Sequence, residues 1–432
     1  MAATLISLTV LLYIFRDFKK GLVLFGTFFF FLKYFPTGFG RISLSFAACL
    51  LLIYTVIIKN PARNNFPLPK PLVLSSLFMI SCWLITEFVS GYGNYMGWFN
   101  LVFLSFAFPW LMWRYISSKE DITRFLKAFI VAFLIIELYG VFQEITNTNP
   151  LFVLINPEVE LESGYRFGLV RINSILVFSS TLGTFSMFAF YLFSRLKRRS
   201  NFFNSNITLF KLPLGNYHFL MFLAIFGIAC SATRSCYLMF AVVLTFIFLD
   251  NIDTSPFKRI LIFLIIGVSL VLIYVMGFSD LLSGLVTRID QSAEGSSSEM
   301  RENQLEICLY WMRDSPIWGN GRNYIFKEVA LWDEDIYGAE SLWFRLLVDY
   351  GIMGCISYIM WIVSIIVVLW KYNRYYIVIP LTLLFGKTTS ILMDVDFEYF
   401  LWLSIVIIKC HQFIFTNNIP YHTNKENYLF LR

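Results

Sequence analysis

The sequence 277-GFSDLLSGLVTRIDQSAEGSSSEMRENQLEICLYWMRDSPIWGNGRNYIFKEVALWDEDIYGAESLWFR-345 is a long polar interval between two hydrophobic segments. Counted through Phe344, it holds twelve Asp or Glu residues against five Lys or Arg residues, which gives a net charge of −7. Most of the remaining chain is hydrophobic. We therefore expect this interval to be the working part of a protein whose other residues form a membrane platform.

The composition of the whole chain indicates an integral membrane protein. Of its 432 residues, 58% are hydrophobic and 14% are charged, and the mean hydropathy is +0.68, outside the range of soluble globular proteins. Seven cysteines are present, but only Cys308 falls in the polar interval, so no disulfide can form within it. The net charge of +6 comes from short basic clusters between apolar runs, which is typical of cytoplasmic anchoring rather than of nucleic-acid binding.

The hydrophobic runs predict an all-α polytopic membrane protein with about 13 transmembrane helices, within a range of about 12–14. Runs of roughly 15 to 22 apolar residues can cross a bilayer when flanking side chains snorkel or the membrane thins locally. The first run has its basic residues after it rather than before it, which predicts a retained helix and not a secretory signal. The expected spans are 2–15, 21–35, 41–58, 72–90, 98–113, 124–142, 173–194, 217–232, 235–249, 259–276, 346–370, 376–393 and 399–415.

Clusters of Lys and Arg orient the chain, since short cytoplasmic loops hold the basic excess. The cytoplasmic clusters lie at 16–20, 59–70, 114–127, 195–199, 258–259 and 371–374. Alternation places the N-terminus outside and the C-terminus in the cytoplasm. The outer segments are then 86–97, 143–172, 231–235, 277–345 and 394–398. We expect one transmembrane domain over 1–432, with a large extracytoplasmic loop at 277–345 that contains short helices and a smaller one at 143–172.

A helix is predicted inside the large loop. Ser296 with Glu299 three residues later favours a capping box at its start, and Pro316 would close it. One face of this helix is apolar and consists of Leu305, Cys308, Leu309 and Met312. Such a face fits a helix that lies along the outer membrane surface, and it fits equally a loop helix packed on the membrane domain.

Ionisable residues inside spans are costly unless they have a partner or a function, and four stand out within or at the ends of predicted spans. They are Glu87, Glu137, Arg234 and Lys387, and the predicted orientation places all four toward the outer side. One interpretation is that Lys387 pairs with Glu87 or Glu137 and holds the bundle together. The other interpretation is a functional role on the outer side.

Arginines gather on the same side in two short motifs. Arg234 lies in SATRS between two spans, and Arg166 and Arg171 lie in YRFGLVRINS before another span. Because a guanidinium binds two phosphate oxygens with parallel hydrogen bonds, these residues suit a lipid-linked diphosphate. The alternative is that they snorkel at the interface and contact only lipid head groups.

An external general base would have to be a carboxylate, because His218, His411 and His422 all fall in or near the cytoplasmic half. Glu340 is the candidate, since it lies just before the span that follows the large loop. The alternative for Glu340 is an ion pair with an arginine such as Arg345.

The sequence lacks the G-x-S-x-G elbow, the Walker loop, H-E-x-x-H and C-x-x-C. The acidic run Asp333 to Asp335 could hold a divalent cation, but adjacent carboxylates in a surface loop are usually only solvated. We favour the solvated interpretation.

Taken in order, the motifs resemble the O-antigen ligase and polymerase superfamily, which includes the Wzy-type polymerases. The order is RINS near 171, SATRS at 231, RID followed by Arg301, DSPIWGNGRN, and ESLWFRLLVDYGIMG, within residues 140–370. The resemblance implies a multi-spanning, GT-C-like glycosyltransferase of the bacterial inner membrane, with its active site facing the periplasm. Its donor and acceptor would be undecaprenyl-diphosphate-linked oligosaccharide, and it would need no metal and no cofactor.

The resemblance also implies roles for single residues. The family's two arginine positions are matched by Arg171, with Arg166 nearby, and by Arg234. The ligase branch has a histidine where this chain has Glu340, so the glutamate favours a polymerase that joins repeat units. Arg171 and Arg234 would hold the diphosphate as negative charge develops, and Glu340 would take the proton of the acceptor hydroxyl. The expected supports are Arg166, Arg301, Arg322 and Arg345.

Two other functions stay open. A ligase would transfer finished glycan to lipid A core, and a transporter or flippase would move the lipid-linked unit across the membrane. No repeated half is visible, and the polar residues gather outside rather than at the midplane, which argues against a transporter. The expected partners are membrane lipid, a chain-length regulator and a flippase, and nucleic acid is not among them.

Overall fold

The computed structural model describes thirteen ranges of the chain, and within them the protein is helical apart from one very short hairpin. In the hairpin, β1 (Tyr165–Arg166) pairs antiparallel with β2 (Leu169–Val170). The described residues are 2–28, 44–61, 68–91, 95–151, 165–166, 169–170, 172–176, 179–199, 202–203, 216–251, 297–332, 341–389 and 396–415.

Four described helical segments are long and apolar enough to cross a membrane. They are α5 (Lys70–Val89), the continuous run α6–η1–α7 (Tyr95–Tyr115), α8 (Lys119–Thr146) and α17 (Leu342–Tyr372). They match the predicted spans 72–90, 98–113, 124–142 and 346–370. These segments confirm the all-α membrane class, whereas the total of about 13 spans stays a prediction.

Shorter helices account for most of the remaining predicted spans. Apolar helical stretches of 10–17 residues occupy Ser7–Arg16, Leu44–Lys59, Tyr217–Cys230, Ser235–Ile247 and Leu401–Phe415. The predicted span 259–276 lies outside the described residues, as do parts of both predicted outer loops and the tail after residue 415. The other helices are α1 (Ala2–Arg16), α2 (Phe18–Thr27), α4 (Leu44–Lys59), α6 (Tyr95–Val102), α7 (Phe108–Tyr115), α10 (Ser179–Arg199), α11 (Tyr217–Cys230), α12 (Arg234–Asn251), α15 (Ser297–Met312), α16 (Ala330–Trp332), α18 (Val378–Thr389) and α19 (Asp396–Cys410).

Local sequence explains where the long helices begin and bend. Ser118 caps α8 by accepting a hydrogen bond from Asp121 N (3.1 Å), and Asn147 ends the helix in a left-handed conformation. Within the described ranges, four short segments depart from α-helical geometry: the π-helical turns η1 (Phe103–Ala107), η4 (Ile325–Val329) and η7 (His411–Phe415), and the 3₁₀ turn η6 (Arg374–Ile377). The first of them precedes Pro109, whose missing N–H is a common cause of such a break.

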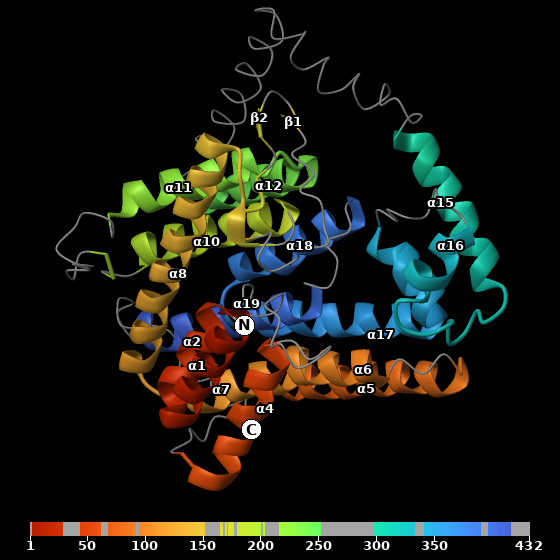
Figure 1. Ribbon diagram of the computed structural model, residues 1–432, viewed down its shortest axis with the longest axis horizontal. Helices are drawn as coiled ribbons and strands as arrows, with labels where there is room; N and C mark the ends of the chain where they lie inside the picture. The colour runs from red at the N-terminus through yellow and green to blue at the C-terminus, as the bar shows by residue number, and fades with distance from the viewer. Residues whose placement is uncertain are drawn as a thin grey trace, which may run out of the picture.

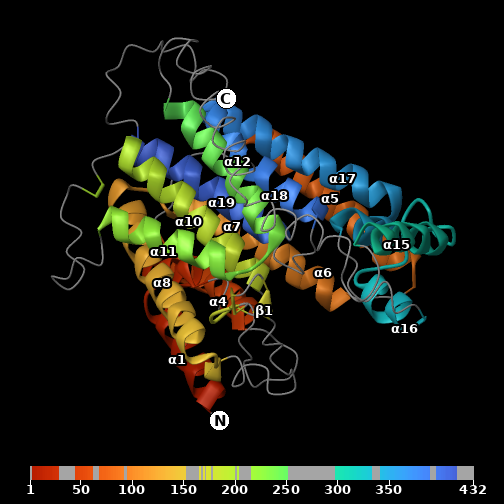
Figure 2. The same ribbon diagram turned by 90° about the horizontal axis from the view of Figure 1, so that it is seen from above.

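Helices α5 and α17 lie side by side along one edge of the molecule in both views (Figures 1 and 2). The ring of Trp83 stacks on that of Tyr350, with centroids 3.8 Å apart and planes at 15°. Deeper in the same interface, Ser75 Oγ and Ser364 Oγ are 2.7 Å apart. Helices α10, α11 and α12 form a second group on the opposite side, and α19 lies between the groups (Figure 1).

The outer-loop helix α15 stands at one end of α17 together with α16 (Figures 1 and 2). Cys308 is fully buried against Ile325 and Val329 of η4 and Val348 of α17, and these four residues form a small core separate from the main one. Burial, together with the nearby Asp349 carboxylate, raises the pKa of the Cys308 thiol to about 12. Of the two interpretations of this helix, packing on the membrane domain is therefore the one seen.

The predicted apolar face of α15 is not buried as a unit. Leu305 and Leu309 stay 40% and 42% exposed, while Cys308 is buried. The helix ends at Met312, four residues before the predicted stop at Pro316, and Ser296 lies outside the described residues. Of the four residues of this predicted face, only Cys308, which meets η4 and α17, is therefore fully removed from solvent.

Candidate functional site

Helix α17 is broken at Gly351, whose φ of 62° and ψ of −164° fall in a region open essentially to glycine. The outer loop supplies the backbone hydrogen bonds that the break interrupts. We call loop residues 316–321 and helix residues 348–353 the Gly351 junction. Its four bonds run from Asn320 N to Val348 O (3.0 Å), from Gly321 N to Asp349 O (2.9 Å), from Ile352 N to Pro316 O (3.0 Å) and from Met353 N to Ile317 O (3.1 Å).

The two backbones of the Gly351 junction touch because glycines face each other. A Cβ on Gly319 would lie 2.5 Å from the carbonyl carbon of Asp349, and a Cβ on Gly351 would lie 2.6 Å from Ile317 O. Thr86 Oγ1, near the end of α5, donates to Trp318 O (2.6 Å) and ties the same loop to a second membrane helix. The GNG motif is thus the point at which the outer loop is fixed to the membrane domain.

A buried carboxylate organises the loop beyond the junction. Asp349 Oδ2 accepts a hydrogen bond from Asn323 N (2.8 Å), and its Oδ1 accepts one from Ile325 N (3.0 Å). Arg345 lies one turn earlier on α17; its Nε is 3.5 Å from Asp349 Oδ2, and its Nη2 donates to Asn323 Oδ1 (2.6 Å). Because Asp349 is fully buried, this set of partners offsets the cost of removing its charge from water.

A second buried acid holds the same loop from α5. Glu87 Oε1 accepts a hydrogen bond from the backbone N of Arg322 (2.8 Å), and both residues are buried. We call Glu87, Arg322, Arg345 and Asp349 the junction cluster. Its two carboxylates and two guanidiniums balance in charge, and Arg345 is committed to groups of the protein itself. The cluster therefore fits a role in holding the loop better than one in binding an anion.

The RINS motif forms hydrogen bonds with two helices, α11 and α8. Ile172 N donates to Cys230 O at the end of α11 (3.1 Å). Ser174 N donates to Gln143 Oε1 of α8 (2.8 Å). Ser174 Oγ donates to Ile136 O, about two turns earlier in the same helix (2.5 Å). These bonds fix the segment that enters α10 against both neighbours.

Buried amides tighten this attachment. Gln143 Nε2 donates to Asn173 Oδ1 (3.0 Å), and Asn149 Nδ2 donates to the same oxygen (2.8 Å) and to Ser174 O (2.7 Å). Tyr139 OH then donates to Asn149 Oδ1 (2.9 Å). A satisfied polar network of this kind specifies one arrangement of the chain.

The SATRS motif forms a tight turn into α12. Ala232 has a positive φ of 46°, and Thr233 Oγ1 donates to Ser231 O (2.9 Å). Gly183 of α10 permits the close approach, since a Cβ there would lie 2.6 Å from Ser231 Oγ. Arg234 is the first residue of α12, where unpaired backbone N–H groups and the helix dipole favour negative charge.

The two arginine motifs are therefore joined. We call residues 172–174 and the turn 231–233 the arginine joint. Ile172 follows Arg171 in the sequence, and Cys230 comes four residues before Arg234, so the hydrogen bond between Ile172 and Cys230 joins the two motifs through their described residues. The start of α12, with its unpaired backbone N–H groups, is suited to an anion such as a diphosphate.

The structure describes the predicted site residues unequally. Arg171, Glu340 and the acidic run 333–335 lie outside the described residues. Described by backbone alone are Arg166 in β1, Arg234 in α12, Arg301 in α15 and Lys387 in α18. The two expected supports, Arg322 and Arg345, are described in full and meet in the junction cluster. The roles of the residues that lie outside the described ranges, and of those described by backbone alone, stay predictions. So does the pairing of Lys387.

Several site residues were not singled out from the sequence. Asp349 carries an available signal, a carboxylate just inside a predicted span, whereas Gln143 and Asn149 carry none because uncharged amides are common at helix ends. Glu137 was singled out, and the structure buries it with Oε1 accepting from Ser186 Oγ (2.5 Å) and Oε2 unpartnered. Among the described residues, no three His, Cys, Asp or Glu side chains group in a way that could hold a metal ion.

Comparison with known proteins gives one match. Residues 219–359, about a third of the chain, match the family described as O-antigen ligase, while no curated protein matches. The matched region begins in α11, contains the turn of the arginine joint, and ends after the Gly351 junction. The match confirms the resemblance to the O-antigen ligase and polymerase superfamily.

Proposed function

We propose that this chain, which carries the O-antigen ligase family domain at residues 219–359, is a polysaccharide polymerase of the bacterial inner membrane. It would join undecaprenyl-diphosphate-linked repeat units on the periplasmic side. The observation that carries the proposal is the arginine joint, where the bond from Ile172 N to Cys230 O ties the RINS motif to the turn that leads into α12.

The reaction follows from the charges of the groups involved. An acceptor hydroxyl oxygen bonds to the anomeric carbon of the donor sugar while the bond from that carbon to the diphosphate oxygen breaks. The leaving diphosphate gains negative charge, which Arg171 and Arg234 would stabilise with Arg166 and Arg301 in support. Glu340 would accept the proton of the acceptor hydroxyl. Arg322 and Arg345 would act indirectly, by holding the loop.

The choice of polymerase over ligase depends on Glu340. A ligase-type site in this superfamily has a histidine at the position of the base, and this chain has a glutamate there. The family match is compatible with both activities. The growing glycan would be passed onto a new lipid-linked unit, and a flippase and a chain-length regulator would be the natural partners.

The decisive experiment uses purified full-length protein and the lipid-linked repeat unit alone. A polymerase yields a ladder of products that differ by one repeat, and a ligase yields none without a lipid A core acceptor. Cells lacking the protein give an independent readout. Loss of a polymerase leaves single repeat units on the core, whereas loss of a ligase leaves long chains on the carrier lipid. The second pattern would refute the proposal.

A further inference from the structure

A groove lies on the outer surface of the large loop, between α15 and α16. It has a volume of about 690 Å³, within the usual range for ligand sites. Five of its residues are aromatic or aliphatic and two are charged. They are Ile307, Leu309, Tyr310, Trp311, Trp332, Glu306 and Arg313. None of them belongs to the arginine joint or to the junction cluster.

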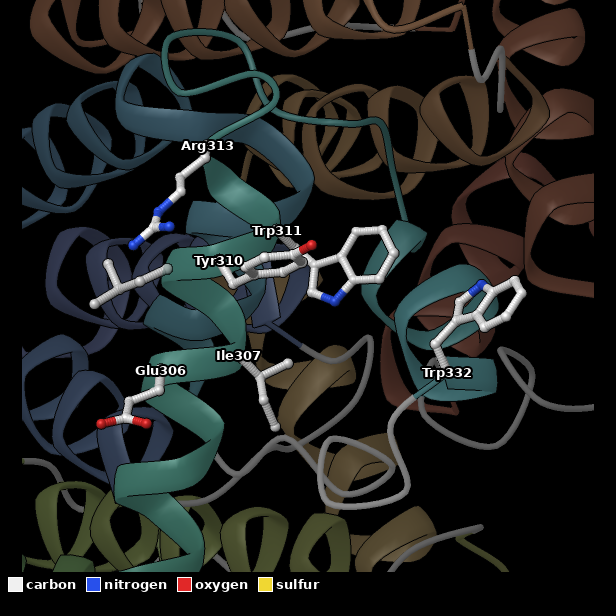
Figure 3. A pocket seen from close by; sticks show the side chains of 7 residues that line it. Glu306, Ile307, Tyr310, Trp311, Arg313 and Trp332 are labelled. Atoms are coloured by element: carbon white, nitrogen blue, oxygen red, sulfur yellow. The ribbon is translucent and has the colours of Figure 1, made fainter.

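The groove combines rings and charges in a definite arrangement. In Figure 3 the rings of Trp311 and Trp332 lie on one side of α15 and the ring of Tyr310 crosses its front, while Glu306 and Arg313 extend from the other side. Tyr310 and Trp332 are 63% and 78% exposed. Covering large aromatic surfaces that are open to water lowers the free energy, so these rings favour the binding of a ligand.

Both walls of the groove stand on the same small core, so their spacing is fixed. Cys308 anchors α15 in that core, and Val329 anchors the segment that leads directly into α16. Trp311 is held as well, because its carbonyl accepts a hydrogen bond from Asn320 Nδ2 (3.1 Å) and its ring lies edge-on to Tyr324 at 6.0 Å. A preformed groove loses little entropy when a ligand binds.

A sugar chain matches this chemistry. Each pyranose ring has an apolar C–H face that can lie on an aromatic ring, and a rim of hydroxyls that donate to a carboxylate and accept from a guanidinium. Glu306 and Arg313 supply these two groups, and both lie beside Tyr310 of α15, four residues before it and three after it. The groove is also close in sequence to the proposed reaction site, since Trp332 precedes the candidate base Glu340 by eight residues.

A membrane surface fits the same groove less well. Surface-binding helices carry Lys and Arg on their polar face because they meet anionic lipid. Helix α15 instead exposes Glu302 and Glu306, and the loop as a whole is acidic. Glycan carries no such electrostatic penalty when its sugars are uncharged.

We propose that the groove between α15 and α16 binds sugar residues of the growing glycan, behind the unit being transferred, and so sets how long the chain becomes. The inference rests on the proposed function for the identity of the glycan. A growing chain that is held along the groove stays bound between additions, whereas the first joining of two single units does not need the groove.

Binding is measured on the full-length protein in detergent, with repeat-unit polysaccharide released from the producing cells by mild acid and therefore free of lipid and diphosphate. Tyr310→Ala and Trp332→Ala should each weaken binding about tenfold, a loss of roughly 1.4 kcal/mol. Tyr310→Phe should bind within about twofold of the wild type because it keeps the ring. Leu305→Ala is the matched control, since Leu305 is a similarly exposed α15 residue outside the groove.

The product ladder gives the functional readout. The two alanine variants should form the first product at the wild-type rate and lose the long products. Unchanged glycan binding in both variants, or a shortened ladder in Leu305→Ala to the same extent, would refute the groove assignment. If the wild type binds glycan through Tyr310 and Trp332 but forms no ladder, the groove stands and the proposed polymerase activity fails.

The competing occupant is tested in proteoliposomes. A bimane dye on Trp332→Cys reports on the groove, and phospholipid with a doxyl group in its chain quenches the dye on contact. Strong quenching that added polysaccharide does not relieve would assign the groove to the membrane surface and overturn the proposal. Weak quenching, with a change in emission on addition of polysaccharide, supports it.

Discussion

At the scale of single residues, the proposed chemistry depends on the shape of the guanidinium as much as on its charge. Arg234→Lys keeps the charge at the start of α12 and loses the planar fork that binds two phosphate oxygens. We expect the rate of ladder formation to fall roughly 10- to 100-fold, because the lysine loses one or more hydrogen bonds to the charged diphosphate. Arg124→Lys, at an exposed position of α8, is the control and should change nothing. A normal rate in Arg234→Lys would remove this arginine from the diphosphate site.

The role of Glu340 as general base is tested by replacing one of its carboxylate oxygens with an amide nitrogen. Glu340→Gln preserves size and removes the ability to accept a proton, so the rate should fall by about 10²- to 10⁴-fold while the protein stays folded. Glu302→Gln is the matched control, because Glu302 is an exposed acid of the same loop outside the groove. Full activity in Glu340→Gln, at equal expression, would mean that another group takes the proton.

The residues of the site could be predicted from the sequence to different degrees. Arg171 and Arg234 could be singled out because of their residue type and their place in short motifs between predicted spans, and their role stays a prediction. The pairing of Arg345 with Asp349 was within reach of the sequence, since the two residues are four apart on one helix, whereas the bond from Arg322 N to Glu87 of α5 was not. Contacts between distant segments follow from packing, which local patterns do not contain.

At the scale of elements, the Gly351 junction makes a strong prediction. In Gly351→Ala the new methyl would lie 2.6 Å from Ile317 O on a backbone that only glycine adopts readily, so we expect a destabilisation of roughly 3 kcal/mol or more. Gly91→Ala separates the two causes, because Gly91 also has a positive φ of 68° but has nothing within 4 Å of its Cβ position. It should lose only about 1–2 kcal/mol. Thermal unfolding in detergent measures both, and equal losses would show that the close contact is unimportant.

Hydrophobic length predicted the long helices well, since α8 and α17 contain the predicted spans 124–142 and 346–370, and α5 covers all but the last residue of 72–90. The same criterion gave no hint of the break at Gly351, because the span 346–370 has the composition of a normal span apart from Asp349. For α15 the apolar pattern predicted a helix correctly. It did not distinguish packing from membrane contact, which depends on η4 and Val348.

At the scale of the whole molecule, the orientation in the membrane is the main prediction. Glu302→Cys, exposed on α15, should react with a membrane-impermeant maleimide in intact spheroplasts, because the large loop is expected outside. Glu120→Cys, exposed at the start of α8 in a basic cluster, should react only after the membrane is opened. The native Cys308 should stay unlabelled in both, since it is buried and its raised pKa keeps the thiol protonated at neutral pH. Labelling of Glu120→Cys in intact spheroplasts would invert the topology and exclude a periplasmic site.

The fold class was predictable from composition alone, and the family region from the order of five weak motifs. Their arrangement in space required the structure: two motifs meet at the arginine joint, and two others meet at the Gly351 junction, in different groups of helices (Figure 1). Four of the five motifs are thus halves of two contacts, which explains why each of these is weak alone and informative in order, while RID lies outside the described residues.

The Gly351 junction also limits how such proteins can be re-engineered. A designer who wished to change sugar preference by exchanging outer loops between relatives would naturally cut at the membrane border, before residue 342. In the recipient, two backbone carbonyls and two backbone N–H groups of α17 would then lose the loop residues 316–321 that form hydrogen bonds with them. The transferable unit is therefore the loop together with the first turns of the crossing helix, through Met353, and chimaeras spliced there should retain their fold where shorter grafts collapse.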